Sequence, residues 1–499
     1  MNDHEKSHAV VVPAKPGNKG AKAKAKATAD SVEGRTATKR NSTKGNTCRT
    51  QSRESVGEAL GRVRQAAKQH RTMRFTALLH HVTVERLTQA YAKTRKQAKP
   101  GIDGVTWSEY GEGLEEKIRE LHGRIHRGAY RPEPTRRTYI AKADGSLRPL
   151  GVATIEDKIV QRAVGEVLNA IYEEDFKGFC YGFRAGRSQH DALDALATAL
   201  DRKRVNWVLD VDIQSFFDTV GHEWMRKFLE HRIGDKRVVR LIMKWLTAGV
   251  MENGEWTESE SGTPQGATIS PLLANIYLHY AFDQWAHRWR RTARGEVVIV
   301  RFADDFVMGF EHRADAEEFR EQLGDRLRKF GLVVHPEKTR LVEFGRYAAE
   351  RRRRRGEGKP ETFRYLGFVH ICATDRKGRF AILRLTDPKR MRRKLHQLRK
   401  EIERRRHDPV PAQGAWLHSV IRGFDQYHGI PNNIDALEAF RHALLRLWRH
   451  ALRRRSQTNR ITSERMARLS AKWFPDAAIV HPWPQQRFDA KTQGRNRMR

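Results

Sequence analysis

The chain has 499 residues, with 96 lysine and arginine residues against 60 aspartate and glutamate residues, a formal net charge of +36. This length permits roughly two or three domains with a sizeable core. The excess of positive charge is larger than an enzyme of neutral metabolites needs. It suits a polyanionic partner, most simply nucleic acid, with an anionic membrane surface as the competing explanation.

Two further features of the composition narrow the setting. No apolar run approaches the roughly 20 residues that span a bilayer, and no signal-peptide pattern is present. The three cysteines, Cys48, Cys180 and Cys372, are isolated from one another, so they predict neither a disulfide framework nor a paired-cysteine metal site. We therefore expect a reducing, cytoplasmic environment.

The N-terminal segment, residues 1–55, is predicted to be a disordered basic arm. Stretches such as "NKGAKAKAKATAD" contain few large apolar residues and cannot bury enough surface to offset the entropy of ordering. A solubilising tail and a nucleic-acid contact are equally compatible with this composition.

The next segments predict helices and one hairpin. The stretch "TMRFTALLHHVTVERLTQAYAKTRKQ" has a helical pattern, and "GIDGVTW" follows it as a loop. In "RRTYIAKADGSLRPLGV", Tyr139 to Lys142 and Leu147 to Val152 predict two strands joined by a turn at Asp144-Gly145. A helix is expected over "IEDKIVQRAVGEVLNAIYEED".

The middle of the chain alternates strands and helices. "VNWVLDVDIQSFFDTV" is strand-like, and Ser270 followed by Pro271 indicates the start of a helix after the glycine-rich loop "ESGTPQGATIS". "RFADDFVMGF" predicts strand, tight turn and strand, and "ADAEEFREQLGDRLRKFG" a helix. "LVVHPEKTRLVEF" and "FRYLGFVH" read as strands, with a polar loop near Arg351 to Arg355 between them.

After about residue 385 only helical patterns remain, in the arginine-dense segments "PKRMRRKLHQLRKEIERRR" and "NIDALEAFRHALLRLWRHALRRR". The order of elements predicts an α+β body followed by an all-helical basic region.

Two adjacent aspartates, Asp304 and Asp305, interrupt the apolar run of "RFADDFVMGF". Alone, such a pair is most simply an exposed hairpin turn. Burying both charges is costly unless a cation compensates them, and Mg²⁺ prefers carboxylate oxygens. Asp212 also ends an apolar strand. If the two strands lie side by side, these acids converge on one point, where two metal ions would serve nucleotidyl transfer.

The ordered series "KADGSLRPLG", "GFRAGRSQHDAL", "DIQSFFD", "GTPQGATISPLLANIYL", "RFADDF", "GLVVHPEKT" and "YLGF" resembles the reverse transcriptases encoded by bacterial group II introns. The resemblance implies a right-hand polymerase with fingers and palm over residues 56–380, then a helical thumb and maturase domain over 381–455. Residues 456–499 would form a basic segment that extends toward DNA.

The resemblance also implies the catalytic residues. Asp212, Asp304 and Asp305 match the catalytic carboxylates, with two Mg²⁺ ions per site. Asp212 and Asp304 would bind the metals directly, the main-chain carbonyl of Ile213 would add a ligand, and Asp305 would have the lesser metal role. Lys338, in "HPEKT", matches a lysine near the pyrophosphate and would act as a general acid toward that leaving group; a plain surface lysine is the alternative.

Residues that would bind the incoming deoxynucleotide are implied in the same way. Phe217 matches an aromatic residue that excludes a 2′-hydroxyl, although core packing is the default for a phenylalanine. Gln265 and Gly266 match a nucleotide-contacting pair, with a ligand-free loop as the alternative. Lys142 and Arg148 flank the hairpin turn and suit a triphosphate, or simply a solvated hairpin.

Contacts to RNA are expected from two basic groups. Arg184 and Arg187 lie in a turn before a helix, where they would contact template phosphates or satisfy carbonyl groups. In the C-terminal helices we expect four residues to face RNA: Arg392, Arg393, Lys394 and Arg399.

Three features depart from the usual pattern of the family. Phe302 stands where a tyrosine is usual. The segment "WLHSVIRGFDQYHGI" carries Asp425 and His428 and matches the maturase helix only loosely. The histidine-rich and paired-cysteine motifs of an endonuclease domain are missing, and "AIVHPWPQQRFDAK" resembles the close of endonuclease-free relatives. We therefore expect a borrowed primer, such as a nascent strand at a replication fork.

The implied function is an RNA-directed DNA polymerase that binds its intron RNA, assists splicing and copies the intron into DNA during target-primed insertion. Its partners would be group II intron RNA, target DNA, primer and deoxynucleoside triphosphates, in the bacterial cytoplasm near the nucleoid. The oligomeric state stays open and allows a dimer. A domesticated reverse transcriptase in host defence or diversity generation, and a non-catalytic RNA-binding splicing cofactor, remain the alternatives.

Overall fold

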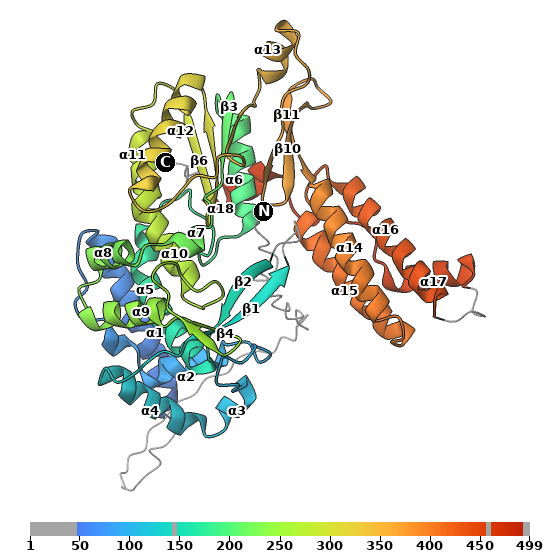
Figure 1. Cartoon of the computed structure of the whole chain (residues 1–499). Coiled ribbons are helices and arrows are strands. Elements are labelled where there is room, and N and C mark those ends of the chain that lie inside the picture. The colour runs from blue at the N-terminus through green and yellow to red at the C-terminus, as the bar shows by residue number, and fades with distance from the viewer. Residues whose placement is uncertain (1–46, 142–146, 456–460, 493–499) are drawn as a thin grey trace, which may run out of the picture.

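A computed structural model describes residues 47–141, 147–455 and 461–492 (Figure 1). Its N-terminal part is a helical layer in which α1 and α2 pack on α5. The helices of this layer are α1 (Thr47–Gln69), α2 (Val84–Ala92), α3 (Trp107–Gly111), α4 (Leu114–His126) and α5 (Ile155–Asp175), with a short 3₁₀ turn at Leu79–His81.

Two expectations for this layer need correction. α1 begins at Thr47, so the last residues of the segment expected to be a disordered arm are helical. The helical pattern expected from residue 72 is realised only in part, because Phe75 bridges to Ile233 and the helix α2 starts at Val84. The prediction for α5 is confirmed, and Thr154 caps it by accepting a hydrogen bond from the Asp157 amide.

The first sheet has the strand order β2-β1-β4-β5, formed by β1 (Thr135–Ala141), β2 (Leu147–Val152), β4 (Val250–Glu252) and β5 (Glu255–Thr257). β1 and β2 are antiparallel and pair Tyr139 with Pro149, which confirms the predicted hairpin. Its turn, with Lys142, Asp144 and Gly145, lies outside the described residues.

The central sheet has the order β6-β7-β3-β8, with antiparallel neighbours throughout. Its strands are β3 (Trp207–Val211), β6 (Val297–Phe302), β7 (Asp305–Phe310) and β8 (Arg340–Glu343). Alternate residues enter two cores: Leu209 and Met308 pack toward α12 (Arg313–Arg328), whereas Val208 and Val307 pack toward α6 (Gln189–Arg202). The strand, tight turn and strand predicted at "RFADDFVMGF" are confirmed.

Helices join the strands of this body. They are α7 (Phe216–Thr219), α8 (His222–Arg232), α9 (Lys236–Thr247), α10 (Ser270–Leu278) and α11 (Gln284–Trp289), with a π-helical turn at His279–Asp283 between the last two. α10 begins at Ser270 as predicted, although the serine hydroxyl donates to the Pro264 carbonyl instead of capping the helix.

A third sheet has the order β11-β10-β9 and consists of β9 (Phe363–Tyr365), β10 (Phe368–Thr374) and β11 (Phe380–Thr386). The expected loop near Arg351 to Arg355 is mostly a helix, α13 (Ala348–Arg354), because Arg351 and Arg355 both pair with the buried Glu343. The strand expected over residues 332–344 is limited to β8.

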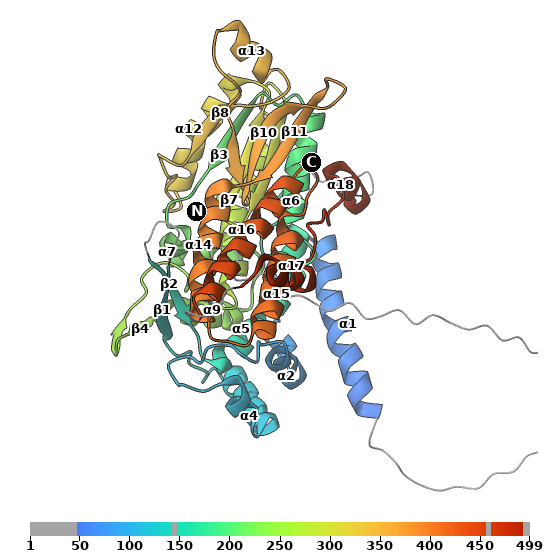
Figure 2. The same cartoon turned by 90° about the vertical axis from the view of Figure 1, so that its right-hand side faces the viewer.

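The C-terminal region is helical, as predicted, and has its own core around Trp448 and Phe440. It contains α14 (Pro388–Arg404), α15 (Val410–His428), α16 (Ile434–Arg453) and α17 (Ser463–Trp473). Figures 1 and 2 show these helices standing beside the body of the protein, beyond the β10–β11 hairpin. The last helix, α18 (Pro484–Thr492), returns to pack on α6.

Candidate active site

The turn between β6 and β7 carries the first predicted carboxylate. Because Phe302 pairs with Asp305, the turn consists of only two residues, Ala303 and Asp304. Ala303 adopts a left-handed conformation with φ of 57°. Asp304 is 8% exposed. The simple explanation of an exposed polar turn is therefore wrong, and a buried acid has to be accounted for.

Asp212 lies beside this turn. It follows β3 directly, and β3 is the neighbour of β7, with Val211 paired to Phe306. Asp212 and Asp305 line one open cavity of about 300 Å³ between the central sheet, the third sheet and α14. The structure thus brings the predicted acids to the same end of the sheet from positions far apart in the sequence.

The electrostatics show how closely these acids interact. Burial raises the pKa of Asp305 well above its ordinary value, and the charges of Asp304, Asp212 and Asp210 raise it further. Burial raises the pKa of Asp210 to about 7, with Arg340 opposing and Asp212 adding to the shift. Four carboxyl groups therefore lie close enough in one weakly solvated region for their negative charges to repel one another.

Asp210 is absent from the predicted site, although it lines the same cavity. The sequence carried a signal for it: Asp210 and Asp212 are two residues apart, and alternate strand residues share a face.

A divalent cation would fit the chemistry of this region, because it supplies the positive charge that the oxygen donors lack. In the described part of the chain, no group of three or more such side chains already stands at metal-binding geometry. Ile213, expected to contribute its carbonyl, is buried and bridges Val334 through the main chain.

Cations surround the acids. Lys338 Nζ lies 3.3 Å from Asp212 Oδ2. Several arginines from distant segments line the cavity as well: Arg340, Arg364, Arg390 and Arg393. None of these arginines was expected at the cavity, and only Arg393 was expected to face RNA, because nothing in the local sequence predicts that the third sheet and α14 face the strands that carry the acids.

Residues expected to bind the nucleotide come from three adjoining segments. The Phe217 carbonyl accepts from the Thr263 amide at 2.7 Å, and Gln265 Nε2 donates to Asp218 at 3.3 Å. Gly151, at the end of β2, donates to the Gln265 carbonyl at 2.7 Å. Phe217 is partly buried, and Arg148 lies on β2.

Gly266 shows why this loop needs glycine. Its φ is 107°, and a Cβ atom there would stand 3.0 Å from the Gly151 carbonyl. Two loops and a strand end are therefore packed closely at the expected nucleotide site.

Arg184 and Arg187 satisfy main-chain carbonyl groups, which is the second of the two roles considered for them from the sequence. The Arg184 side chain is 3% exposed; it pairs with Glu173 and donates to the Lys177 and Cys180 carbonyls. Arg187 donates to the Gly178 and Cys180 carbonyls. Arg184 is therefore not placed to contact template phosphates, which corrects that expectation.

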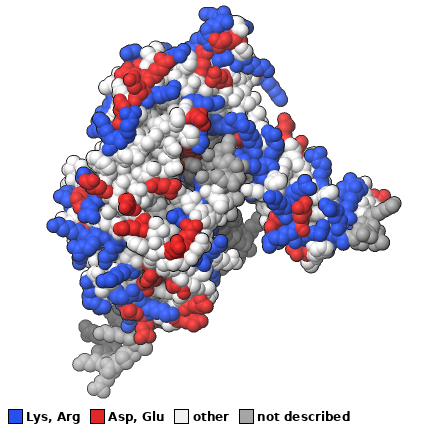
Figure 3. All heavy atoms as spheres, in the orientation of Figure 1, with Lys and Arg blue, Asp and Glu red and all other residues white. Residues whose placement is uncertain are grey.

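The four residues expected to face RNA all lie on α14. Arg393 lines the cavity, whereas Arg399 pairs with Glu403 and Arg392 donates to the Pro388 carbonyl. Figure 3 shows Lys and Arg side chains gathered over the C-terminal helices on one face of the molecule. Lys394 belongs to the same helix and is half-buried. None of the helices in the described ranges is long and apolar enough to cross a membrane.

Comparisons with known proteins agree with this geometry. Residues 140–370 match the family model described as reverse transcriptase (RNA-dependent DNA polymerase). Protein YkfC of Escherichia coli is 36% identical over 274 residues, which cover 48% of this chain and 72% of YkfC. Group II intron-encoded protein LtrA of Lactococcus lactis is 42% identical over 166 residues, 33% of this chain and 27% of LtrA. Nuclear intron maturase 4 of Arabidopsis thaliana is 25% identical over 154 residues, covering 30% of this chain and 18% of the maturase.

Proposed function

The chain belongs to the reverse transcriptases encoded by group II introns, a family of RNA-directed DNA polymerases, and on this premise we propose that it extends a primer at Asp212, Asp304 and Asp305. The observation that carries the proposal is the meeting of the β3 end with the buried β6–β7 turn. Asp212 and Asp305, from two separate motifs, line one cavity there, and the charge of Asp304 acts on Asp305.

The fold suits a right-hand polymerase. The central sheet corresponds to the palm, the β1–β2 hairpin with the helices around α5 to the fingers, and α14 to α16 to the thumb. The cavity would lie between palm and thumb, and it is lined by acids and by arginines, of which Arg390 and Arg393 come from α14. Such a distribution suits a nucleic-acid backbone held beside a metal-dependent centre.

Reverse transcriptases use divalent metal ions, and the donors here suit two Mg²⁺ ions. Asp212 and Asp304 would hold them, together with the Ile213 carbonyl, and Asp305 would contribute mainly negative charge. When bound, the ions would activate the primer 3′-hydroxyl and stabilise the departing pyrophosphate. Lys338, which donates to Asp212, would give a proton to that leaving group.

The incoming deoxynucleotide would lie against Phe217, Gln265 and Gly266. Phe217 would block a 2′-hydroxyl by steric contact, and the Gln265 amide could donate to the sugar or base. Arg148, on the hairpin strand, would grip the triphosphate. The matching cation Lys142 lies outside the described residues.

The partners we propose are group II intron RNA, target DNA and its primer. The net charge of +36 and the cavity arginines of α14 support nucleic-acid binding. The maturase names of the relatives favour a role in splicing, followed by insertion of the copied intron. The buried acids at the cavity argue against a purely RNA-binding cofactor, because negative charges there would repel the phosphates of RNA unless a metal ion lies between them.

Primer extension on an RNA template tests this function. The Asp304→Asn protein should bind the primer–template but extend it at least a thousandfold more slowly than wild type, because a charged ligand is removed from the centre of charge stabilisation. Asp325→Asn, on the exposed face of α12, is the matched control and should extend normally. Equal DNA yield from wild type and Asp304→Asn would end the polymerase proposal.

A further inference from the structure

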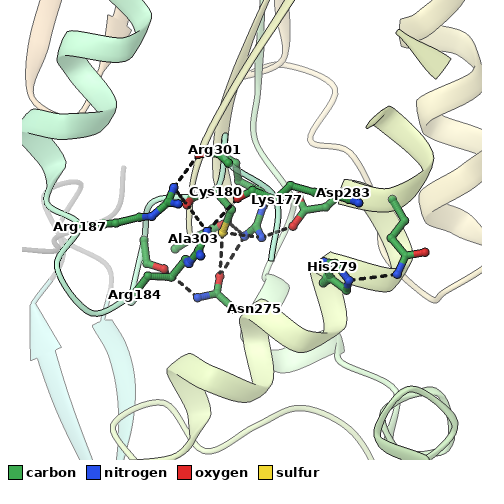
Figure 4. A network of polar contacts seen from close by, with 12 residues as sticks. Lys177, Cys180, Arg184, Arg187, Asn275, His279, Asp283, Arg301 and Ala303 are labelled. Carbon is green, nitrogen blue, oxygen red and sulfur yellow. Dashed lines mark hydrogen bonds and ion pairs between the residues drawn. The ribbon is translucent and has the colours of Figure 1, made fainter. Parts of the chain in front are cut away.

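The guanidinium group of Arg301 is enclosed directly behind the catalytic turn (Figure 4). Its side chain has no exposed surface, and all five N–H groups have acceptors. Nε and Nη2 form a forked pair with Asp283 at 2.7 and 2.6 Å. Nη1 donates to Asn275 at 3.1 Å and to the Ala303 carbonyl at 2.8 Å, and Nη2 also donates to Cys180 Sγ at 2.9 Å.

The contact with Ala303 joins this network to the site. Ala303 is the residue before Asp304 in the two-residue turn, and its left-handed φ of 57° is unfavourable for a residue with a Cβ atom. A carbonyl held by a charged donor can fix such a conformation. The direction in which Asp304 leaves the turn follows from it.

Two other segments hold the same turn from outside. The Arg301 amide donates to the Phe179 carbonyl, and the Tyr181 amide donates to the Arg301 carbonyl. Gly182 lies so close that a Cβ atom there would stand 2.3 Å from the Ala303 nitrogen. Asn275 also donates to the Gly182 carbonyl at 2.7 Å. Residues 179–182 therefore hold the end of β6 through main-chain bonds and pack closely on Ala303. We call Arg301, Asp283, Asn275 and residues 179–182 the frame of the turn.

Asp283 and Asn275 connect Arg301 to two other elements of the protein. Asp283 is the last residue of the π-helical turn between α10 and α11. A π-helical turn holds more residues than an α-helical one, so the side chains after it point in other directions than a continuous α-helix would give. Asn275 lies on α10, the helix that follows the loop with Gln265 and Gly266. The frame thus connects the expected nucleotide loop with the acid-bearing turn.

Stability alone does not explain a wholly buried ion pair. Removing two charges from water is costly, and a well-packed apolar pair of similar volume is often as stable or more so. An apolar pair, however, cannot donate to the Ala303 carbonyl. The feature that distinguishes the pair from an apolar replacement is therefore the geometry it imposes on the turn.

We propose that Arg301, held by Asp283 and Asn275, is a positioning residue that fixes the Ala303–Asp304 turn and thereby the placement of the Asp304 carboxylate for nucleotide addition. This proposal rests on the polymerase function proposed above. It assigns no contact between Arg301 and substrate.

The test compares wild type with an Arg301→Met/Asp283→Leu double variant on the same RNA template and primer. We expect a thermal midpoint close to wild type and unchanged affinity for primer–template. The kcat for nucleotide addition should fall about a hundredfold, as for a displacement of about 1 Å in a catalytic group, while the KM for deoxynucleotide changes little. Titration with Mn²⁺, followed by electron paramagnetic resonance, should show weaker binding at the site.

A matched control is available in the same chain. Arg232 and Asp175 form another buried ion pair with side chains 2% and 9% exposed, and Arg232 also donates to the His70 and Met73 carbonyls. Arg232→Met/Asp175→Leu should leave kcat and Mn²⁺ binding unchanged, because those carbonyls are remote from the catalytic turn.

Should the double variant not fold, Arg301→Lys decides the question. Lysine keeps the charge opposite Asp283 but offers one nitrogen in place of the fork, so it cannot also hold Asn275 and Ala303. A kcat within twofold of wild type in a folded Arg301 variant would overturn the positioning role while leaving the polymerase function intact. A wild-type protein without extension activity would instead overturn the polymerase function.

Discussion

Lys338 donates to Asp212 across a sequence separation of 126 residues, with Nζ 3.3 Å from Oδ2, and both residues line the cavity of the candidate active site. The lysine side chain is half exposed, with 51% of its surface accessible, whereas that of Asp212 is 22% accessible. An exposed ion pair contributes little stability. We therefore expect this contact to matter for the reaction more than for the fold.

Lys338→Gln should lower kcat about tenfold to a hundredfold, since a positioned general acid contributes that much or more, with a smaller change in KM. Single-turnover nucleotide addition measures both. Lys329→Gln, an exposed lysine after α12, serves as the control. A decrease of less than twofold would show that Lys338 is an ordinary surface residue.

Phe217→Val should admit ribonucleotides. The ring is partly buried and meets Phe216 edge-on at 5.3 Å, so it has a fixed position from which to oppose a 2′-hydroxyl. Opening that space should raise the relative efficiency of ribonucleotide over deoxynucleotide incorporation about tenfold to a hundredfold. Competition assays with the two nucleotides measure the ratio. An unchanged ratio together with a lower thermal midpoint would assign Phe217 to the core alone.

Replacing Arg390 and Arg393 by alanine should weaken binding of an RNA–DNA duplex. Both line the cavity from α14, and removing one arginine–phosphate ion pair should reduce the slope of log affinity against log salt by about one. Fluorescence anisotropy across a salt series measures the slope. Arg404→Ala, paired with Glu401 on the same helix, should leave it unchanged. Equal slopes for all proteins would remove α14 from the interface.

Acid should destabilise the protein through its buried histidines. Burial lowers the pKa of four of them from 6.5 to between about 2 and about 3: His190, His279, His370 and His428. As pH falls below 6.5 the unfolded chain takes up protons before the folded chain does, so this stability is present above 6.5 and is lost toward the folded-state pKa. Each histidine should reduce the free energy of unfolding by about 1 kcal/mol per pH unit.

Urea unfolding at several pH values between 7.5 and 5.5 measures this dependence. His370→Phe removes one titrating group that already stacks on Phe363 at 4.6 Å, so its curve should be shallower. His407→Phe, at an exposed position, should follow wild type. A His370→Phe curve as steep as that of wild type would contradict the prediction, since this comparison cancels the opposing effect of buried acids such as Asp210, whose pKa is raised.

Asp194→Asn should strongly destabilise the junction between α6, β11 and α18. The Asp194 side chain is 1% exposed and pairs with both Arg384 and Arg487. Removing its charge therefore leaves two arginine side chains without this carboxylate partner. We expect a cost of about 3–5 kcal/mol, against at most about 1 kcal/mol for Asp489→Asn in the exposed pair with Arg202. Thermal unfolding compares the two. Equal midpoints would show that α18 is not held through Asp194.

This junction also bears on the expectation that residues 456–499 extend toward DNA. Arg487 and Lys491 of α18 are engaged by Asp194 and Asp191 of α6. These two basic side chains are thus committed to contacts within the chain. The junction joins positions almost 300 residues apart, and the basic composition of the segment gave no indication of it.

Local patterns predicted much of the fold. The start of α5, the β1–β2 hairpin and the turn at Ala303–Asp304 follow from capping, alternation and turn chemistry over a few residues. Long-range pairing explains most of the errors. The arginines around position 351 look like a loop until Glu343 pairs with them, and Arg184 looks solvent-facing until Glu173 and two carbonyls enclose it.

The meeting of Asp212 with the turn at Asp304 and Asp305 was predictable because each motif is local and both interrupt apolar strands. Their surroundings were not. Arg364 of the third sheet and Arg390 of α14 line the cavity. Asp283, which pairs with Arg301 behind the turn, comes from a π-helical turn. Each depends on how distant segments pack, which periodicity in a single segment does not report.

The enclosure of Cys180 has a practical consequence for chemical labelling. Burial raises the pKa of its thiol, and its sulfur is covered by Arg301 and Asn275. Cys372 is half-buried, and burial raises its pKa to about 11. Maleimide dyes react with exposed thiolates, so both of these native cysteines should stay unmodified. Once Cys48 is replaced by serine, a fluorophore on a cysteine introduced into α16 would report how the helical region moves when nucleic acid binds.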